Sequence, residues 1–246
     1  MKTDDLPADA APIAFTLDGK RVEAAPGETL LQVADRAGVV LPRLCASEGL
    51  RPAGNCRACV VEIEGERVLA PSCCRAPVEG MVVHTATPRA SGARRTVIEL
   101  LLADAPDTQA LKHDSELAHW ADATGARPGR FPARASVPGR PELVEGLAHT
   151  SAGLRQAQPE RMSARPGRDG VDTSHPAMTV HLDACIQCTR CIRACRETQG
   201  NDVLGLAFRG GHAQIVFDQN DPMGLSTCVA CGECVQACPT GAIAPA

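Results

Sequence analysis

Aromatic residues are nearly absent from this sequence. Its 246 residues include no tyrosine, one tryptophan and four phenylalanines. Aromatic side chains usually dominate the area that a core buries. An ordinary aromatic-rich core is therefore excluded, and small domains of this chain need another source of stability. The thirteen cysteines are the candidates for that source.

The sequence also lacks the features of exported, membrane-spanning and nucleic-acid-binding proteins. Residues 1–12 are expected to be a flexible N-terminus, and they are acidic with no apolar stretch of a secretory signal. The longest apolar run, around residues 97–103, is too short to span a bilayer. A net charge of −4 and an isoelectric point near 6.0 give no basic surface for nucleic acid or membrane. We therefore expect a cytoplasmic protein, in which regularly spaced cysteines bind metal rather than form disulfides.

Residues 13–87 have the pattern of a compact β-rich domain. The stretches IAFTL and RVEAA flank Asp18-Gly19, which is a hairpin signal. PGETLLQVADRAG predicts a helix that is capped by Thr29 and ends at Gly38. Further strands are predicted at CVVEIEG, RVLAP and MVVHT. Two hairpins, one helix and a final strand together predict a small β-grasp sheet.

The next part of the chain is predicted to be a helix followed by a linker. The stretch PRASGARRTVIELLLA predicts a helix over residues 88–103. Residues 104–172 are rich in Arg, Pro, Gly and Ala, and we expect a largely disordered linker there. Codons that can encode residues 141–146 and 154–158 are largely reverse complements, so we hypothesise that an inverted DNA repeat was inserted in frame. An ordinary low-complexity linker is the alternative, and the gene sequence distinguishes the two.

Residues 173–246 are built on a repeated cysteine motif. CIQCTRCIRAC begins at Cys185 and CVACGECVQAC begins at Cys228, and both have the spacing C-x2-C-x2-C-x3-C. Between the two copies, DVLGLAFRGGHAQIVFD predicts two short strands around an Arg-Gly-Gly turn. The repeat predicts a domain with internal pseudo-symmetry.

This spacing is typical of a protein that binds two [4Fe-4S] clusters. Three thiolates in a tight loop can bind three corners of a cubane, and the last cysteine of each motif then ligates the other cluster. The expected ligands of cluster A are Cys185, Cys188, Cys191 and Cys238, and those of cluster B are Cys228, Cys231, Cys234 and Cys195. Pro239 follows the second motif, as this arrangement expects, whereas Arg196 stands in place of proline after the first.

Zinc and disulfides are the alternatives for these eight thiols. Zinc sites commonly pair two C-x2-C knuckles, and the additional cysteines of each motif would then be surplus. A non-redox structural or zinc-binding domain therefore fits the spacing less well than an electron-transfer domain does. Anaerobic absorbance together with iron and sulfide analysis distinguishes these possibilities.

The N-terminal domain carries a second kind of cysteine set. Cys45, Cys56, Cys59 and Cys73 follow the spacing C-x10-C-x2-C-x13-C, and four thiolates suffice for one [2Fe-2S] cluster. Gly49 and Gly54 lie in the loop between the first two of these cysteines, where glycines let backbone amides approach cluster sulfurs. Cys74 is left over, and we interpret it as a bystander thiol rather than a ligand.

The stretches PAGNCRACVVEIEG and CIQCTRCIRACRETQG, together with STCVACGECVQACPTGAI, carry a resemblance to a known family. They are similar to the N-terminal iron-sulfur region of the molybdenum- or tungsten-containing, NAD-dependent formate dehydrogenase α subunit. That region is itself similar to the large iron-sulfur subunit of complex I, to the small diaphorase subunit of NAD-reducing hydrogenase and to the N-terminus of [FeFe] hydrogenase. The resemblance implies a chain of clusters that carries electrons between a flavin and a catalytic metal site.

Two departures from the family pattern affect this interpretation. The family usually binds a further [4Fe-4S] cluster through one His and three Cys, but Ala105 stands where that His is expected and Ser115 is the best remnant of the last Cys. We expect this cluster to be absent and interpret His113 and His119 as solvated helix residues. Only TGAIAPA follows Pro239, so we expect no molybdopterin domain in this chain.

The resulting expectation is an α+β protein with no catalytic residues of its own. It would join a β-grasp [2Fe-2S] domain to a bacterial-type ferredoxin domain with two [4Fe-4S] clusters. Its expected partners are a flavin- and NAD-binding diaphorase subunit and a molybdopterin-containing catalytic subunit of a formate dehydrogenase-like enzyme. The alternatives are a diaphorase small subunit of an NAD-reducing hydrogenase or complex I-like enzyme, and a truncated, degenerate formate dehydrogenase α chain.

Overall fold

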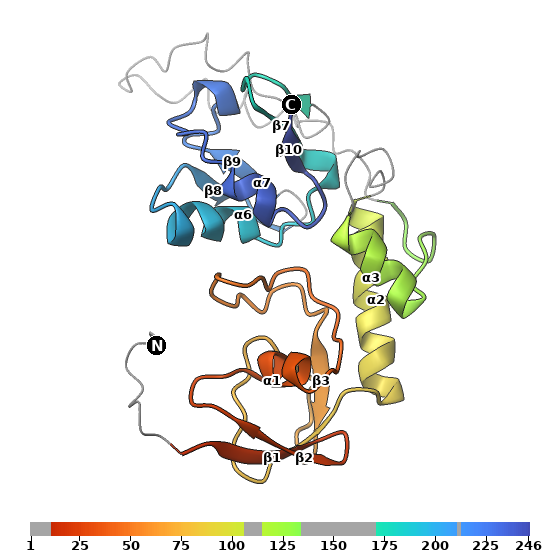
Figure 1. Ribbon diagram of the computed structural model, residues 1–246. Coiled ribbons are helices and arrows are strands. Elements are labelled where there is room, and N and C mark those ends of the chain that lie inside the picture. Colours follow the sequence, from red (N-terminus) through yellow and green to blue (C-terminus); the bar gives the residue numbers. More distant parts are fainter. Residues whose placement is uncertain (1–10, 106–114, 134–170, 211–212) are drawn as a thin grey trace, which may run out of the picture. The chain divides into compact units, whose positions relative to one another are not determined.

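The computed structural model describes residues 11–105, 115–133, 171–210 and 213–246 (Figure 1). The chain divides into two compact units. Unit 1 comprises Met1–Leu102 and Glu116–Phe131, and unit 2 comprises Ala103–Ser115 and Pro132–Ala246. The predictions for the first ten residues, for His113 and for the inverted repeat fall outside the described residues.

The sheet of unit 1 begins with the predicted hairpin. Strand β1, Ile13–Leu17, pairs antiparallel with β2, Lys20–Ala24, in a register that places Leu17 opposite Lys20. Asp18 and Gly19 both have positive φ, at 48° and 79°, as a two-residue hairpin loop requires. The hairpin signal in the sequence is therefore confirmed.

Three further strands complete a mixed sheet of the β-grasp type. They are β3, Val60–Ile63, β4, Ala70–Pro71, and β5, Val82–His84, and the strand order is β2-β1-β5-β3-β4. Strand β5 lies in the middle, where it pairs parallel with β1 and antiparallel with β3. Both hairpins and the final strand agree with the fold expected from the sequence.

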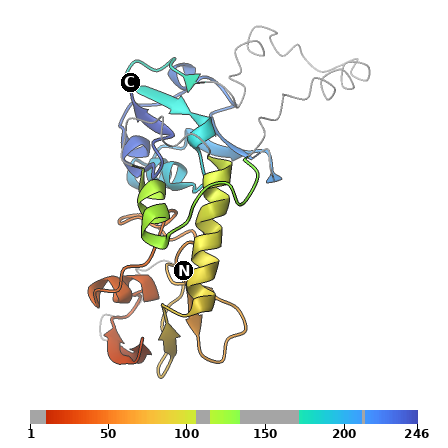
Figure 2. The same cartoon turned by 90° about the vertical axis from the view of Figure 1, so that its right-hand side faces the viewer.

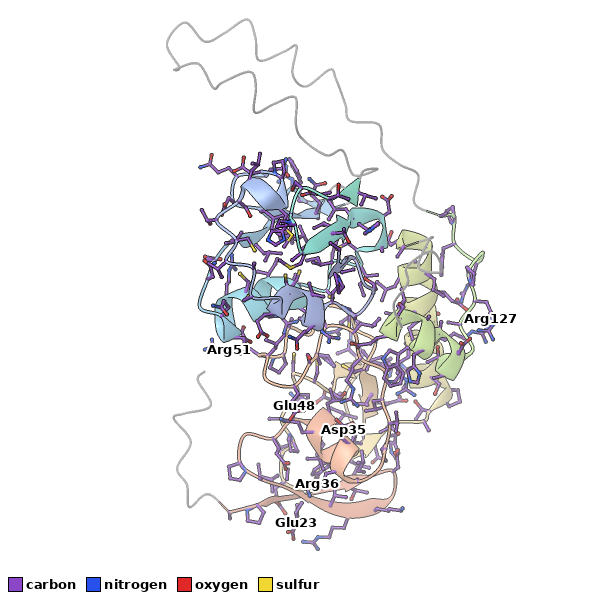
Figure 3. The ribbon with its side chains drawn as sticks, turned by 45° about the horizontal axis from the view of Figure 1, so that its top comes forward. Glu23, Asp35, Arg36, Glu48, Arg51 and Arg127 are labelled. Atoms are coloured by element: carbon purple, nitrogen blue, oxygen red, sulfur yellow. The ribbon has the colours of Figure 1, made fainter. Side chains whose placement is uncertain are left out.

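Helix α1, Leu30–Arg36, packs against this sheet (Figure 1). The Oγ1 atom of Thr29 accepts the backbone N–H of Gln32, and the side chain of Gln32 accepts the N–H of Thr29, so the two residues form a capping box. At the other end, Arg36 donates to the carbonyl oxygen of Glu23 on β2 at 2.8 Å (Figure 3). Arg36 also donates to the side chain of Glu28 at 2.8 Å. These bonds hold the helix against the strand that precedes it.

The core of unit 1 is aliphatic. Phe15 is the single aromatic side chain in a buried cluster otherwise made of aliphatic residues, Met81 and two of the cysteines, Cys59 and Cys73. Leu30 and Val83 lie at its centre and are at most 1% exposed. The core therefore forms with little aromatic area, and two candidate ligands belong to it.

Two helices follow the sheet. The second lies within residues 104–172, where we expected a largely disordered linker, so that prediction is wrong for this part of the chain. Helix α2, Pro88–Asp104, was predicted, but α3, Glu116–Thr124, was not. Figures 1 and 2 show α3 lying along α2. Leu117 and Ala121, four residues apart, are buried. Two buried positions in a nine-residue stretch are too weak a signal for a helix, and tertiary packing stabilises it instead.

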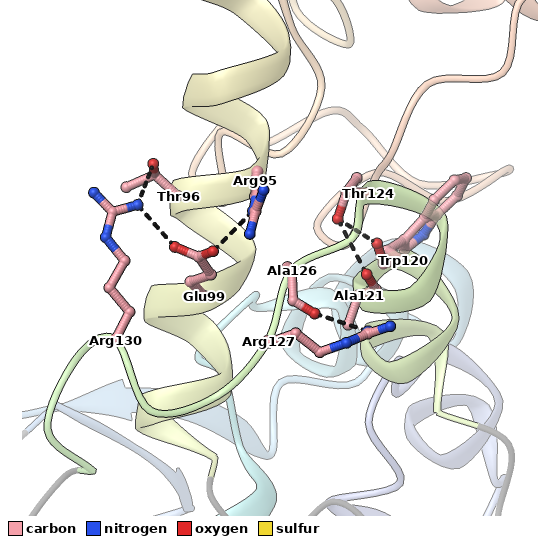
Figure 4. Close-up of polar contacts among 9 residues, drawn as sticks. All are labelled: Arg95, Thr96, Glu99, Trp120, Ala121, Thr124, Ala126, Arg127 and Arg130. Atoms are coloured by element: carbon pink, nitrogen blue, oxygen red, sulfur yellow. Dashed lines mark hydrogen bonds and ion pairs between the residues drawn. The ribbon is translucent and has the colours of Figure 1, made fainter.

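A buried carboxylate joins α2 to the segment after α3. The Glu99 side chain is 4% exposed and pairs with Arg95 at 3.0 Å and with Arg130 at 2.9 Å (Figure 4). Burial raises the pKa of Glu99, but the hydrogen bonds and charges of Arg130 and Arg95 outweigh it and hold the pKa below its ordinary value.

Replacement of Glu99 by Gln is expected to destabilise unit 1 at neutral pH and to reduce its sensitivity to acid. A carboxyl whose pKa is lowered by folding stabilises the protein above its unfolded pKa, about 4.3, and loses this effect as the pH falls through the folded value. Urea unfolding at pH 7 and below pH 4, followed by fluorescence of Trp120 on α3, measures both effects. Asp122→Asn is the control, because its ion pair with Arg127 is exposed and contributes about 0–1 kcal/mol. An equal acid sensitivity in Glu99→Gln and the parent protein would contradict the expectation.

Unit 2 has two small sheets. Strand β7, Met178–His181, lies between β6, Val171–Asp172, and β10, Ile243–Pro245, with both pairings antiparallel. Strands β8, Leu204–Ala207, and β9, Gln214–Phe217, form the hairpin expected between the cysteine motifs. The three-stranded sheet was not predicted, because its strands of two to four residues carry little periodic signal.

Short helices carry the cysteine motifs. Helix α6, Arg190–Arg193, continues into a π-helical turn at Ala194–Thr198, and α7 spans Glu233–Ala237. Single 3₁₀ turns occur at Leu182–Ala184 and Met223–Leu225. None of the helices within the described ranges is long and apolar enough to cross a membrane.

Candidate functional site: three groups of four cysteines

The four cysteines of unit 1 come together at one end of the β3–β4 hairpin. Cys59 immediately precedes β3, and Ser72 alone separates Cys73 from the end of β4. Val60 pairs with Pro71, so the two strands bring these cysteines side by side. Both the N–H and the Oγ of Ser72 donate to the carbonyl oxygen of Cys59, at 3.2 and 2.7 Å, and fix this arrangement.

The loop before β3 supplies Cys45 and Cys56. The backbone N–H of Cys45 donates to the Sγ of Cys56 at 3.4 Å. Hydrogen bonds from Cys56 and then Cys73 lower the pKa of Cys45 to about 2, and the same bonds raise the pKa of both donors. The hydrogen bond from Cys73 lowers the pKa of Cys59 to about 6. Contacts of Cys45 with Cys56 and Cys73, and of Cys73 with Cys59, thus gather the four predicted ligands into one group, and their binding of a cluster stays a prediction.

Cys74 lies beside this group and is exposed. Its Sγ is 3.6 Å from the Sγ of Cys73. Gly54 has a φ of +66°, and a Cβ there would lie 2.8 Å from the Sγ of Cys74. A side chain at position 54 would therefore displace either the loop or this thiol, which explains why glycine occupies the position.

In unit 2, one apolar cavity is lined by cysteines from both motifs. These cysteines are Cys185, Cys188, Cys191 and Cys238. Val180, Ile215 and Ile243 form part of the apolar wall. The first three cysteines come from the loop before α6 and from α6 itself, while the fourth follows α7 directly. The lining matches the ligand set expected for cluster A.

A second cavity has the complementary lining. It contains Cys195, Cys228, Cys231 and Cys234. Helices α6 and α7 pack against each other, and the π-helical turn that follows α6 carries Cys195 toward the other motif. Each cavity therefore takes three cysteines from one motif and the fourth from the other.

The difference between Arg196 and Pro239 has a structural consequence. Proline disfavours helical backbone in the residue before it, and Cys238 is extended with a ψ of 115°. Arg196 imposes no such restriction, so the helix at the first motif continues to Thr198. Both fourth cysteines still reach the cavity of the opposite motif.

The two motif loops have matching backbone conformations. Gln187 and Thr189 have φ values of 56° and 62°, and the corresponding residues Ala230 and Gly232 have values of 57° and 81°. Three of these four residues are not glycine, and such strain tends to occur at functional sites. Loops of this kind turn backbone N–H groups inward and bind anionic groups, including iron-sulfur clusters. The N–H of Ala230 already donates to the Sγ of Cys228 at 3.4 Å.

Three buried thiols of unit 2, those of Cys188, Cys191 and Cys234, have raised pKa values and are difficult to ionise without a metal. Burial raises the pKa of Cys188 to about 12, against the opposing backbone hydrogen bond and charge of Arg190. Burial, followed by the charges of the neighbouring cysteines of its cavity, raises the pKa of Cys234 to about 12. Burial also holds the pKa of Cys191 well above its ordinary value. Bound iron would supply the positive charge that keeps these groups as thiolates.

The donor set of unit 2 fits clusters. Its thiols line two cavities, and a [4Fe-4S] cluster fills a volume because each of its four thiolates binds a different iron. The residues present therefore suit the clusters expected from the sequence. No group of three or more His, Cys, Asp or Glu side chains that could hold a metal ion is found among the described residues.

The region where the family binds its one-His, three-Cys cluster, which we expect to be absent here, can be followed only in part. Ala105 and Ser115 are both buried, and the residues between them lie outside the described ranges. His119 is an exposed residue of α3, as predicted.

Sequence reasoning missed the charged residues that begin α6 and α7, which are Arg190 and Glu233. Each lies between the second and third cysteines of its motif. An alignment of the two motifs with each other would have revealed them.

Comparison with known proteins agrees with both cysteine-bearing units. Residues 10–88 match the family described as 2Fe-2S iron-sulfur cluster binding domain. Residues 175–244 match the family described as NADH-quinone oxidoreductase subunit 3, ferredoxin-like domain.

Similar proteins include subunits of larger oxidoreductases. An NADH-quinone oxidoreductase subunit of Rhizobium meliloti is 32% identical over 94% of this chain and 24% of its own length. The NADP-reducing hydrogenase subunit HndD of Solidesulfovibrio fructosivorans is 33% identical over 94% of this chain and 36% of its own length. The mitochondrial NADH-ubiquinone oxidoreductase 78 kDa subunit of Neurospora crassa is 32% identical, with 95% of this chain and 27% of that protein covered. This chain thus spans about a quarter to a third of the length of these relatives.

A solved structure is similar over most of both chains. It is a chain of an NAD+-reducing [NiFe]-hydrogenase in the H2-reduced state, 26% identical, with a TM-score of 0.73 over 96% of this chain and 88% of that one. Neither the relatives named above nor this structure is a formate dehydrogenase. The chain therefore carries an N-terminal 2Fe-2S iron-sulfur cluster binding domain and a C-terminal ferredoxin-like domain of the NADH-quinone oxidoreductase subunit 3 type.

Proposed function

We propose that this chain is an electron-relay module of an NAD-linked oxidoreductase and holds one [2Fe-2S] and two [4Fe-4S] clusters. The observation that supports this proposal most strongly is the pair of cavities in unit 2, each lined by four cysteines drawn from both motifs. An electron relay needs clusters in fixed positions and no substrate pocket. Such a relay would exchange electrons with protein partners.

The residues of this chain would position and shield the clusters. The thiolates of Cys45, Cys56, Cys59 and Cys73 would hold the [2Fe-2S] cluster, and the two groups in unit 2 would hold the [4Fe-4S] clusters. When bound, the clusters supply one-electron transfer. The apolar wall of the first cavity, including Val180 and Ile243, excludes water from its thiols. The N–H of Ala230 donates to the Sγ of Cys228, and the other left-handed residues of the motif loops would turn their backbone N–H groups toward a bound cluster in the same way.

The partners are a finer part of the proposal. We propose that one partner is a flavin- and NAD-binding subunit and that the other carries the catalytic metal centre. A molybdopterin subunit, as in formate dehydrogenase, rests on the sequence resemblance alone. The diaphorase small subunit of an NAD-reducing hydrogenase is favoured by a specific observation, because the similar hydrogenase chain is covered over 88% of its length. A complex I-like enzyme fits the remaining relatives, and purification of the native complex with identification of its cofactors distinguishes these three.

The anaerobically purified protein is expected to contain about ten iron atoms per chain, two from the [2Fe-2S] cluster and about eight from the two [4Fe-4S] clusters. Iron and acid-labile sulfide analysis, together with visible absorbance, measures this content. Cys74→Ala is the matched control and should keep the same iron content. About fourteen iron atoms would indicate a further [4Fe-4S] cluster, and zinc without sulfide would refute the electron-relay function.

A further inference from the structure

The two cysteine motifs carry opposite charges at one corresponding position. Between the second and third cysteines the first motif has Thr189-Arg190 and the second has Gly232-Glu233. A pseudo-symmetric pair of sites therefore differs by two charge units at a position next to the cluster ligands.

The structure places these two residues equivalently. Arg190 is the first residue of α6 and Glu233 is the first residue of α7. Each is preceded by a left-handed residue, Thr189 with a φ of 62° and Gly232 with a φ of 81°. Because the backbone enters the two helices in the same way, both side chains leave the chain at the same point of their motif.

Arg190 and Glu233 lie beside the two cavities. Arg190 is 5% exposed and lies directly between Thr189 and Cys191, which both line the first cavity. Glu233 is half-buried and lies directly between Gly232 and Cys234, which both line the second cavity. Charges in partly buried positions interact more strongly than charges in bulk water.

Three other charged residues lie near the first motif. Arg193 donates to the carbonyl oxygen of Cys188 at 3.5 Å, and its counterpart in the second motif is the uncharged Gln236. Arg196 is paired with Asp202. Glu197 lies on the π-helical turn beyond Cys195. The first motif is thus the more positive of the two.

These charges bear on the reduction potentials of the clusters. Reduction adds one negative charge to a cluster, so a nearby cation stabilises the reduced form and raises the potential, while a nearby anion lowers it. An apolar cavity opposes the addition of charge. Arg190 therefore offsets the effect of the apolar wall around cluster A, and no similar cation stands at position 233.

We propose that Arg190 and Glu233 set the two [4Fe-4S] potentials independently, Arg190 by raising that of cluster A and Glu233 by lowering that of cluster B. This inference rests on the proposed function, because it requires both clusters. It assigns to these residues a role in directing electrons between the clusters, and neither residue is a ligand.

The test is a redox titration of the whole cluster-loaded chain, followed by electron paramagnetic resonance, for single variants of equal iron content. Arg190→Gln removes the charge but keeps the backbone N–H. It is expected to lower the reduction potential of cluster A and to leave that of cluster B unchanged. Glu233→Gln is expected to raise the reduction potential of cluster B. Arg190→Lys keeps the charge and should restore the parent value. Arg209→Gln is the control, because it removes one positive charge from an exposed residue that lies outside both cysteine motifs.

The outcomes separate this inference from the proposed function. The inference is overturned if both variants shift the potential of the same cluster, or if either shift has the opposite sign. It is also overturned if the shifts are no larger than that of Arg209→Gln. In each of these cases the charges do not set the potentials, and the relay function stands. If Arg190→Gln loses its cluster, Glu233→Arg tests the same rule at the second motif and must raise that potential further than Glu233→Gln. A parent protein without [4Fe-4S] signals would overturn both the inference and the function.

Discussion

Cys195→Ala is expected to remove or damage the cluster bound by Cys228, Cys231 and Cys234, although Cys195 belongs to the other motif. The physical reason is the position of its side chain, which lines the second cavity and not the first. Loss of one thiolate should release the whole cluster, about four irons per chain, or leave a three-iron cluster. Iron analysis and electron paramagnetic resonance of the reduced protein measure the loss.

Cys238→Ala is the matched counterpart and should affect only the cluster bound by Cys185, Cys188 and Cys191. Cys45→Ser is the control in unit 1 and should remove only the [2Fe-2S] signal, because its partners lie around the β3–β4 hairpin. If each alanine variant instead altered only the cluster of its own motif, the crossed arrangement of ligands would be refuted.

Removal of the clusters is expected to unfold unit 2 beyond Ser174. Six of its eight motif cysteines belong to its hydrophobic core or pack against it. Phe217 is the one aromatic side chain in that core. Without iron, Cys188 and Cys234 stay protonated because burial raises the pKa of both thiols. Their polar S–H groups would then lie beside cavities that no cluster fills. Cluster binding should therefore supply much of the folding free energy of this unit, as metals do in other small domains.

Hydrogen exchange of the apo protein measures this effect. The amides of β7 and β10, which pair with each other, should lose their protection. Those of β1 and α1 provide the internal control, because the sheet of unit 1 has a larger aliphatic core around Leu30 and Val83 and should stay protected. Protected amides in β7 and β10 after complete removal of iron would contradict the expectation.

Local sequence signals were sufficient wherever short-range physics decides the structure. The Asp18-Gly19 turn, the Thr29 cap and the hairpin between the cysteine motifs each depend on a few neighbouring residues, and all three form as predicted. The cysteine spacing likewise indicated which thiols would gather, because a C-x2-C-x2-C loop is itself a local structure. In the same way, the scarcity of aromatic residues indicated that the cysteines would join the cores.

Other features depend on contacts between distant parts of the chain. Helix α3 forms in a nine-residue stretch that buries Leu117 and Ala121. The helix lies along α2, which is a contact that its own sequence does not indicate. Strands β7 and β10 are too short to be recognised alone, and their pairing joins the beginning and the end of unit 2. No local pattern reports such pairings, because their energy comes from partners far away in the sequence.

The sequence by itself determined the two cysteine-bearing domains, the twelve candidate ligands and the hairpins that frame them, since these follow from spacing and turn chemistry. The spacing also predicted that Cys195 and Cys238 would each line the cavity of the other motif, and the structure places them there. Only the tertiary structure showed that Arg190 and Glu233 occupy equivalent places beside the cavities. The physical reason is that α6 and α7 must pack against each other before either cavity closes, and this packing joins residues more than forty positions apart.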